Sequence, residues 1–261
     1  MMSLPTIPDL IKRSWQQYKE QSGVLLKVAL AYFVVENIQS ITNLSGLANQ
    51  PWTGIVDQAL FFLGLFLNSW LSVVIIRQVA SGAKQLEKNV FSTAFDQAWP
   101  YFLFTVFILS AFFGGLFLFI LPGLLILFWT SFVEFPLILE GKGIMESIYA
   151  SRNYFRGRGW LLFNRIFVVY APYFLMFLLP FIAVRFPIGN TLVTDLSRSL
   201  ILTLFMPFET IYIYLLYRQI KEETPTSTSA SGKYKTMLIL SGIVGFSLLV
   251  LVTIASIANW Q

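Results

Sequence analysis

The sequence contains no cysteine and no histidine among its 261 residues. The absence of cysteine excludes disulfide bonds, thiolate nucleophiles and cysteine-ligated zinc or iron–sulfur sites. The absence of histidine removes the commonest general base and metal ligand, and it excludes imidazole ligation of haem iron. Any chemistry must therefore rest on carboxylates, lysines, tyrosines and hydroxyl groups. We expect neither a metal nor a cofactor.

Charged residues are also scarce. Only 12% of the residues are charged, whereas 56% are hydrophobic, and the mean hydropathy is +0.70. A water-soluble domain of this length needs more charge to cover its surface, so lipid must surround much of this chain. The composition therefore predicts an all-α, polytopic bundle of transmembrane helices.

Seven apolar stretches are long enough to cross a membrane, since roughly 20 helical residues span the hydrocarbon layer. They lie near residues 23–42, 54–76, 101–121, 123–140, 160–182, 196–217 and 236–258. Residues 97–133 carry no charge, and as one helix they would be about 55 Å long, so the chain must turn back within them. Pro122 and Gly123 predict a tight hairpin there, with a re-entrant turn at Gly114 and Gly115 as the alternative.

The basic residues between these stretches predict an orientation. Sixteen of the 18 lysines and arginines fall on one side of the predicted spans, and only Arg185 and Arg198 fall on the other. Because cytoplasmic loops carry the excess of basic residues, we expect a cytoplasmic N-terminus and, after seven spans, an outside C-terminus. The first 20 residues contain charges and prolines, so they do not predict a cleavable signal peptide. The pI near 9.4 follows from this loop bias and does not require a nucleic-acid partner.

Three segments predict amphipathic helices at the inner membrane surface, each followed by two spans: residues 8–22, 89–99 and 143–157. This plan indicates three copies of one unit and an added last helix. The basic residues expected to contact anionic lipid headgroups at the inner face are Lys12, Arg13, Lys19, Arg152, Arg156 and Arg158. The alternative is that these helices only anchor and orient the spans.

The chain divides into a six-span core over residues 1–221, a polar low-complexity linker over 222–235, and a single transmembrane helix over 236–261. The last helix carries Ser241 and Gly245, a pair of small residues that permits close helix packing. Three surroundings remain open for it: a membrane-protein partner, lipid, or its own chain.

The stretch from Pro136 to Trp160 contains an acidic-glycine turn at Glu140 and Gly141, a helix with Ser151, and a basic entry through Gly157 into the next span. Together with the Pro122–Gly123 pair, and a second match over 207–222, it resembles the membrane domain that precedes the catalytic domain in some bacterial glycerophosphoryl diester phosphodiesterases. The matched stretches cover 41 of the 261 residues. The resemblance implies a six-span fold in a bacterial plasma membrane. No room exists here for the catalytic barrel, so it implies no phosphodiesterase activity.

Four polar residues fall within predicted spans, roughly 8 to 14 Å from the cytoplasmic boundary: Glu134, Arg165, Glu209 and Asn68. Ionisable groups inside a membrane are costly and therefore suggest function. We expect Arg165 to pair with one acid, which leaves the other acid to bind a cation or proton. Pro136 and Pro207 lie two residues from the acids, a pattern that also lines transporter sites. The alternative is a structural polar clamp with two ordinary proline kinks.

Three functions compete. The first is a non-enzymatic scaffold, assembly factor or accessory subunit of a membrane complex, favoured by the absence of catalytic motifs and by the tethered last helix. The second is a carrier or channel for a lipid or small solute that uses the polar layer. The third, an intramembrane enzyme, has the least support, because the sequence has no paired-aspartate motif, phosphate-binding loop or nucleophile elbow.

Overall fold

The computed structural model describes residues 4–37, 53–86, 88–118, 120–183, 191–223 and 238–248, together with residues 236 and 251. Every regular element among these residues is an α-helix, so the predicted all-α class is confirmed for the described part of the chain. The helices are α1 (Ile7–Glu36), α3 (Thr53–Ser81), α4 (Val90–Leu118), α5 (Ile120–Thr130), α6 (Glu134–Leu139), α7 (Ile144–Phe155), α8 (Gly159–Ala183) and α9 (Thr191–Glu223). A further helix covers Leu238–Leu248.

Four of these helices contain stretches long and apolar enough to cross a membrane: Gln58–Ser81, Val90–Gly115, Gly159–Met176 and Leu196–Glu223. They correspond to four of the predicted spans. The predicted span over 23–42 coincides with the second half of α1, and its residues 38–42 lie outside the described part. Most of the predicted linker, residues 224–235, also lies outside it, and α9 runs two residues past the predicted end of the core at 221.

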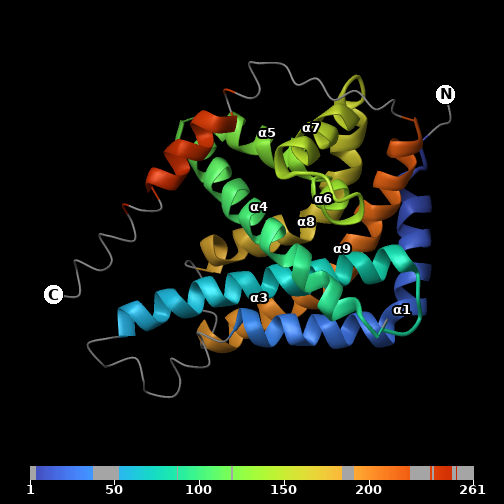
Figure 1. Ribbon diagram of the computed structural model, residues 1–261, viewed down its shortest axis with the longest axis horizontal. Helices are drawn as coiled ribbons and strands as arrows, with labels where there is room; N and C mark the ends of the chain where they lie inside the picture. The colour runs from blue at the N-terminus through green and yellow to red at the C-terminus, as the bar shows by residue number, and fades with distance from the viewer. Residues whose placement is uncertain are drawn as a thin grey trace.

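Two of the three predicted amphipathic segments merge with the spans that follow them. The segment 8–22 forms the first half of α1, which begins at an N-cap where the Thr6 hydroxyl accepts from the Asp9 amide. The segment 89–99 forms the start of α4. Figure 1 shows the first half of α1 beside the end of α9, while the rest of α1, α3 and α9 runs along the longest axis. Only 143–157 gives a separate helix, α7.

The hairpin between α4 and α5 is present. Helix α4 ends at Leu118 and α5 begins at Ile120, so Pro122 lies in the first turn of α5. The two helices approach so closely that a Cβ atom on Gly115 would lie 2.8 Å from the backbone of Gly123. Glycine at both positions is therefore what permits the predicted tight turn.

The predicted span over 123–140 contains a break in the helix. It consists of α5 and α6, separated by turn residues 131–133. The Ser151 hydroxyl of α7 stabilises this break, because it donates to the Trp129 carbonyl at 2.7 Å and accepts from the Phe132 amide at 3.2 Å. One side chain of α7 therefore bonds to the backbone on both sides of the break. The break moves Glu134 to the first position of α6.

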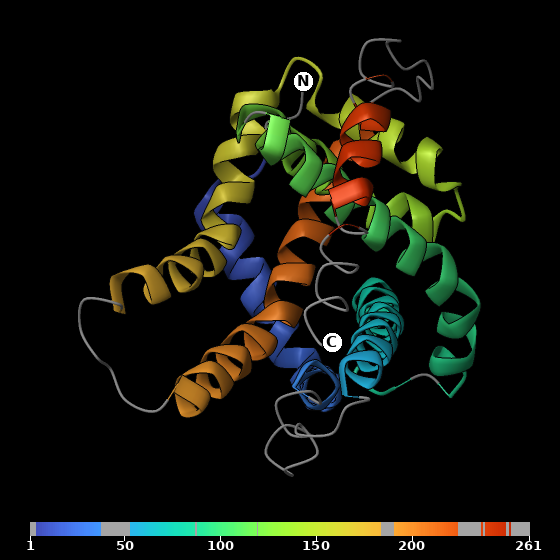
Figure 2. The ribbon, with the colours of Figure 1, turned by 90° about the vertical axis from the view of Figure 1, so that its left-hand side faces the viewer.

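The last described helix packs on its own chain. Figure 2 shows Leu238–Leu248 beside α4 and α5, and Leu238 is fully buried in a cluster with Phe104 and Ile126. Ser241 and Gly245 contact the backbone of Ser110 and Gly114 in α4. Small residues on both helices allow this approach.

Candidate functional site

Two glutamates lie within electrostatic reach of each other inside the bundle. Glu134 begins α6 just after the break that follows α5, and Glu209 lies two residues after Pro207, which interrupts the hydrogen bonding of α9. The two carboxylates are close enough to interact electrostatically. The structure thus brings together two of the four residues that the sequence predicted for a buried polar layer.

Tyrosines surround these two acids. The Tyr101 hydroxyl of α4 donates to Glu134 Oε2 at 3.3 Å. The Tyr170 and Tyr173 hydroxyls of α8 are hydrogen-bond partners of the Glu209 carboxylate. Tyr32 of α1 lies within electrostatic reach of Glu209. We call these six residues the acid–tyrosine cluster: Tyr32, Tyr101, Glu134, Tyr170, Tyr173 and Glu209.

The cluster draws on α1, α4, α6, α8 and α9, yet these helices do not seal it. Glu134, Glu209, Tyr101 and Tyr173 are half-buried, and Tyr170 is 37% exposed. If the acids had only a structural role, we would expect neighbouring helices to cover them completely, because a carboxylate exposed to hydrocarbon is costly. The helices therefore leave these polar groups incompletely covered.

Neither acid has a basic partner among the described residues. The ion pairs recorded there lie elsewhere and join Lys142 and Lys221 to Glu140, and Arg158 to Glu223. Hydroxyl groups can donate to a carboxylate but cannot neutralise its charge. The charge of the cluster is therefore uncompensated by the protein groups around it.

The expected pairing of Arg165 with an acid was wrong. Its Nε donates to the Pro5 carbonyl at 3.1 Å, and one terminal nitrogen donates to the Leu161 carbonyl at 3.0 Å. Arg165 lies only six residues into α8, so its long side chain reaches back to polar groups at the end of the helix instead of staying in the apolar interior. The N-terminal segment therefore holds this guanidinium.

Asn68 also stands apart from the cluster. Its side chain is half-buried in α3, and its Oδ1 has no hydrogen-bond partner. The Ser72 hydroxyl bonds only to the Asn68 backbone carbonyl, at 2.8 Å. No recorded interaction among the described residues joins Asn68 to either acid, so Asn68 does not belong to the acid–tyrosine cluster.

The six predicted inner-face residues divide into two groups. Lys12, Arg13, Lys19 and Arg156 are exposed. The other two are engaged within the chain, since the Arg152 guanidinium lies 5.3 Å from the centre of the Trp129 ring and Arg158 pairs with Glu223 at 2.6 Å. The exposed group remains available for headgroups.

A second acid on α6 has very different surroundings. Glu140, just past the end of α6, accepts from Lys142 at 2.8 Å, from Lys221 at 2.7 Å and from the Tyr217 hydroxyl. Burial alone would raise the pKa of Glu140, but the hydrogen bonds from these three donors outweigh it and lower the pKa to about 2. Glu140 therefore stays ionised and clamps α9 to the end of α6.

Sequence reasoning missed the four tyrosines of the cluster. The chain contains 11 tyrosines, and a tyrosine in a membrane protein is usually explained as an interfacial or packing residue. One weak signal was available: Tyr170 and Tyr173 are three residues apart and therefore share a helix face in an otherwise apolar span. Tyr32 and Tyr101 carry no such pattern.

Among the described residues, no group of three or more acidic side chains gathers in a way that could hold a metal ion. What the arrangement offers is two carboxylates and four phenol groups. No family model matches the chain, and neither the curated proteins nor the solved structures contain a match to it.

Proposed function

We propose that this protein is a membrane carrier for a small solute, and that the acid–tyrosine cluster binds a proton or a cationic group of that solute. The observation that carries this proposal is that Glu134 lies within electrostatic reach of Glu209, with no ion pair to a basic residue recorded for either acid among the described residues. Two nearby carboxylates in a medium of low dielectric repel each other strongly when both are ionised. Uptake of a proton or another cation relieves this repulsion.

The surrounding tyrosines suit a cation. Their hydroxyl groups hold the carboxylates in place, and their ring faces can attract an ammonium group electrostatically. A structural clamp would instead pair each acid with an arginine, a lysine or an amide, as Glu140 does with two lysines. The composition of the cluster therefore favours ligand binding over a purely structural role.

Two acids from other parts of the chain, Glu36 and Glu140, contact residues of α9 on either side of Glu209. Near one end, Glu36 of α1 accepts from Ser199 at 2.9 Å and from Thr203 at 3.2 Å. Glu209 follows Thr203 by six residues, or about 9 Å of helix, and Tyr217, which contacts Glu140, follows by a further 12 Å or so. Tyr32 interacts electrostatically with both Glu36 and Glu209. Glu36, Tyr32 and Glu209 therefore form one polar series beside α9, whereas Glu140 belongs to the clamp near the end of that helix.

The test is charge movement in proteoliposomes adsorbed on an electrode. The purified protein is challenged with protons, K⁺, Na⁺ and primary amines. We expect a current with at least one of these cations, and its loss in Glu134→Gln and Glu209→Gln. Glu146→Gln, which removes an exposed carboxylate on α7, is the matched control and should keep the current. Currents that are absent from the wild type, or equal in all four proteins, would contradict the proposal.

The scaffold or accessory-subunit function is the second candidate. Its support is the outward face of the last helix, where Leu240, Ile243 and Phe246 are each more than half exposed. Such a face can contact a membrane-protein partner as well as lipid. Deletion of residues 222–261 should then remove co-purifying proteins in mild detergent. If every partner stayed, this version of the proposal would fail.

Both candidates share one setting. We propose a bacterial plasma membrane with the N-terminus in the cytoplasm, supported by the resemblance to bacterial membrane domains and by the one-sided distribution of basic residues. The N-terminal half of α1 and the end of α9, which carry many of these residues, lie together at one side of the bundle (Figure 1).

A further inference from the structure

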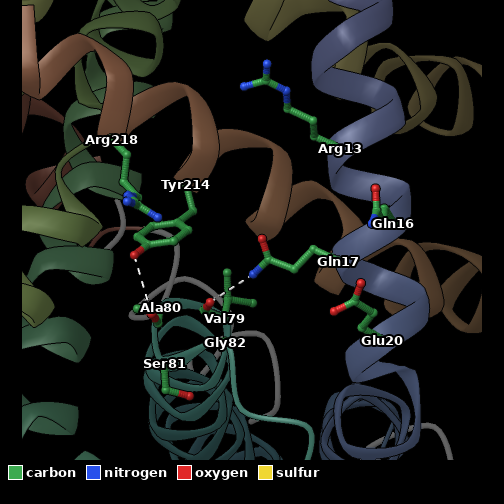
Figure 3. Close-up of a pocket in the computed structure, with 10 residues that line it drawn as sticks. All are labelled: Arg13, Gln16, Gln17, Glu20, Val79, Ala80, Ser81, Gly82, Tyr214 and Arg218. Carbon is green, nitrogen blue, oxygen red and sulfur yellow. Dashed lines mark hydrogen bonds between the residues drawn. The ribbon is translucent and has the colours of Figure 1, made fainter.

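A second site, which shares no residue with the acid–tyrosine cluster, is an open pocket of about 410 Å³ between α1, α3 and α9. The side chains that matter for its chemistry are Arg13, Gln16, Glu20, Ser81, Tyr214 and Arg218. Figure 3 shows that α1 and α9 form its two sides and that the end of α3 forms its floor.

Hydrogen bonds between helices brace this floor. Gln17 Nε2 donates to the Val79 carbonyl at 3.0 Å, and the Tyr214 hydroxyl donates to the Ala80 carbonyl at 3.5 Å. The last carbonyls of a helix lack partners within the helix, and here side chains from α1 and α9 supply them. The walls of the pocket are therefore fixed relative to one another.

Charges of both signs line the pocket without being paired. The structure records no ion pair for Arg13, Arg218 or Glu20 among the residues it describes. The Arg218 guanidinium lies 5.9 Å from the centre of the Tyr214 ring, and both arginines are exposed. Their donor groups are thus free for a ligand.

The charges are also separated within the pocket. In Figure 3 the arginine side chains lie at one end, whereas Glu20 and Ser81 lie toward the other, beside the end of α3. Glu20 supplies the negative charge at this second end. One end of the pocket therefore favours an anion, and the other favours a cation.

The pocket lies at the level where lipid headgroups are expected. The apolar stretch Gln58–Ser81 ends at its floor. On the same part of α1, Trp15 is 51% exposed, and tryptophan is typical of the boundary between hydrocarbon and headgroups.

We infer that this pocket binds a zwitterionic headgroup in which a phosphate ester and an ammonium group are joined by a short link, as in phosphatidylethanolamine. The phosphate would accept from Arg13 and Arg218, whose guanidinium groups suit phosphate oxygens. The ammonium group would lie near Glu20 and the end of α3. The inference concerns a different place from the acid–tyrosine cluster and holds whether or not that cluster moves a solute.

Native mass spectrometry of the full chain in mild detergent tests the inference. The probes are phosphatidylethanolamine, and phosphatidylglycerol, which has the phosphate but no ammonium group. Wild type should retain phosphatidylethanolamine at least about tenfold more strongly, because one charge-assisted contact of 1.4 kcal/mol corresponds to a factor of ten. Arg13→Gln with Arg218→Gln should lower its retention by about the same factor or more.

Glu20→Gln separates a zwitterion site from a simple anion site. It should abolish the preference over phosphatidylglycerol while leaving phosphate binding intact. Lys84→Gln with Lys88→Gln is the matched control, because it removes two exposed cations from the neighbouring loop 82–89 without touching the pocket. That control should bind both lipids like the wild type.

Soluble phosphoethanolamine distinguishes the source of the headgroup. If it displaces the lipid, the site takes a free solute of the same chemistry, and if it does not, the site is specific for the lipid. Equal retention of both lipids by the wild type would overturn the inference. Undiminished retention in the double arginine variant, with its helical content and thermal unfolding unchanged, would overturn it as well.

Discussion

Glu134 and Glu140 are six residues apart on either end of α6, and they have opposite surroundings. Glu140 accepts hydrogen bonds from two lysines and a tyrosine. Glu134 is joined by Tyr101 and faces a second acid, Glu209, with no basic partner among the described residues. The same short helix therefore presents a compensated acid at the edge of the apolar region and an uncompensated acid inside it.

This difference shows how the bundle separates structure from function. Where a carboxylate only fixes helices, the chain supplies cations and places them beside it, as at Glu140. Where cations are withheld, the folded chain bears the cost of an acid in a poorly solvating place. Helix packing does not require this loss of stability. Binding of a proton or a cationic ligand to the acid–tyrosine cluster would explain why the chain tolerates it. Substituting Glu134 and Glu140 one at a time tests whether the two acids have different roles.

The largest effect is expected for Glu140→Ala. The substitution leaves Lys142, Lys221 and Tyr217 without their shared acceptor and frees the end of α9 from α6. Hydrogen bonds to charged groups contribute about 1.5 to 3 kcal/mol each when buried, and partial exposure reduces this. We expect a loss of about 1 to 3 kcal/mol, measured by thermal or denaturant unfolding in detergent.

The exposed Glu146→Ala on α7 is the control for that measurement, and it should stay within about 0.5 kcal/mol of the wild type. If the two alanine variants unfolded alike, Glu140 would not be a clamp, and the contrast with Glu134 would collapse.

Acidification of the wild type should lower the free energy of unfolding gradually and by a smaller amount, because protonation of Glu140 weakens the same contacts. The pKa of Glu140 is about 2 in the folded protein, below its ordinary value of 4.5. The unfolded chain therefore takes up this proton first as the pH falls. The contribution of Glu140 to stability is complete above about pH 4.5 and is lost as the pH falls toward 2.

Glu140→Gln isolates this contribution from that of the other acids. Unfolding of the wild type and of the variant should be compared at steps from pH 6 to pH 2. The difference between them should shrink through this range. A constant difference would show that ionisation of Glu140 does not stabilise the fold.

The helical class and the apolar stretches could be predicted because hydropathy acts locally, residue by residue. The hairpin also followed from local rules, since Pro122 and Gly123 interrupt an uncharged stretch too long for one helix. The close approach of Gly115 to Gly123 became visible only in the structure. The break between α5 and α6 could not be predicted this way. It depends on the Ser151 hydroxyl, which comes from a helix 19 residues further along the chain.

The site was half predictable for a similar reason. Glu134 and Glu209 are conspicuous because acids are rare in spans, and flanking prolines mark both. The partner of Arg165 was predicted wrongly because its position in the span does not determine the direction in which a long side chain extends. Its acceptor is the Pro5 carbonyl, 160 residues earlier in the chain. The tyrosines were missed because only the packing of α1, α4 and α8 near the acids distinguishes them from other aromatic residues.

The smallest effect on stability is expected for Glu134→Gln, and it is the most telling. The amide oxygen of glutamine can still accept from the Tyr101 hydroxyl, while the substitution removes the repulsion from Glu209 and the cost of a carboxylate in the membrane. We expect unfolding to change by less than about 0.5 kcal/mol or to become harder. A loss as large as that of Glu140→Ala would make both acids structural clamps. Preserved stability combined with a lost cation-driven current would instead mean that the chain keeps Glu134 for its ligand.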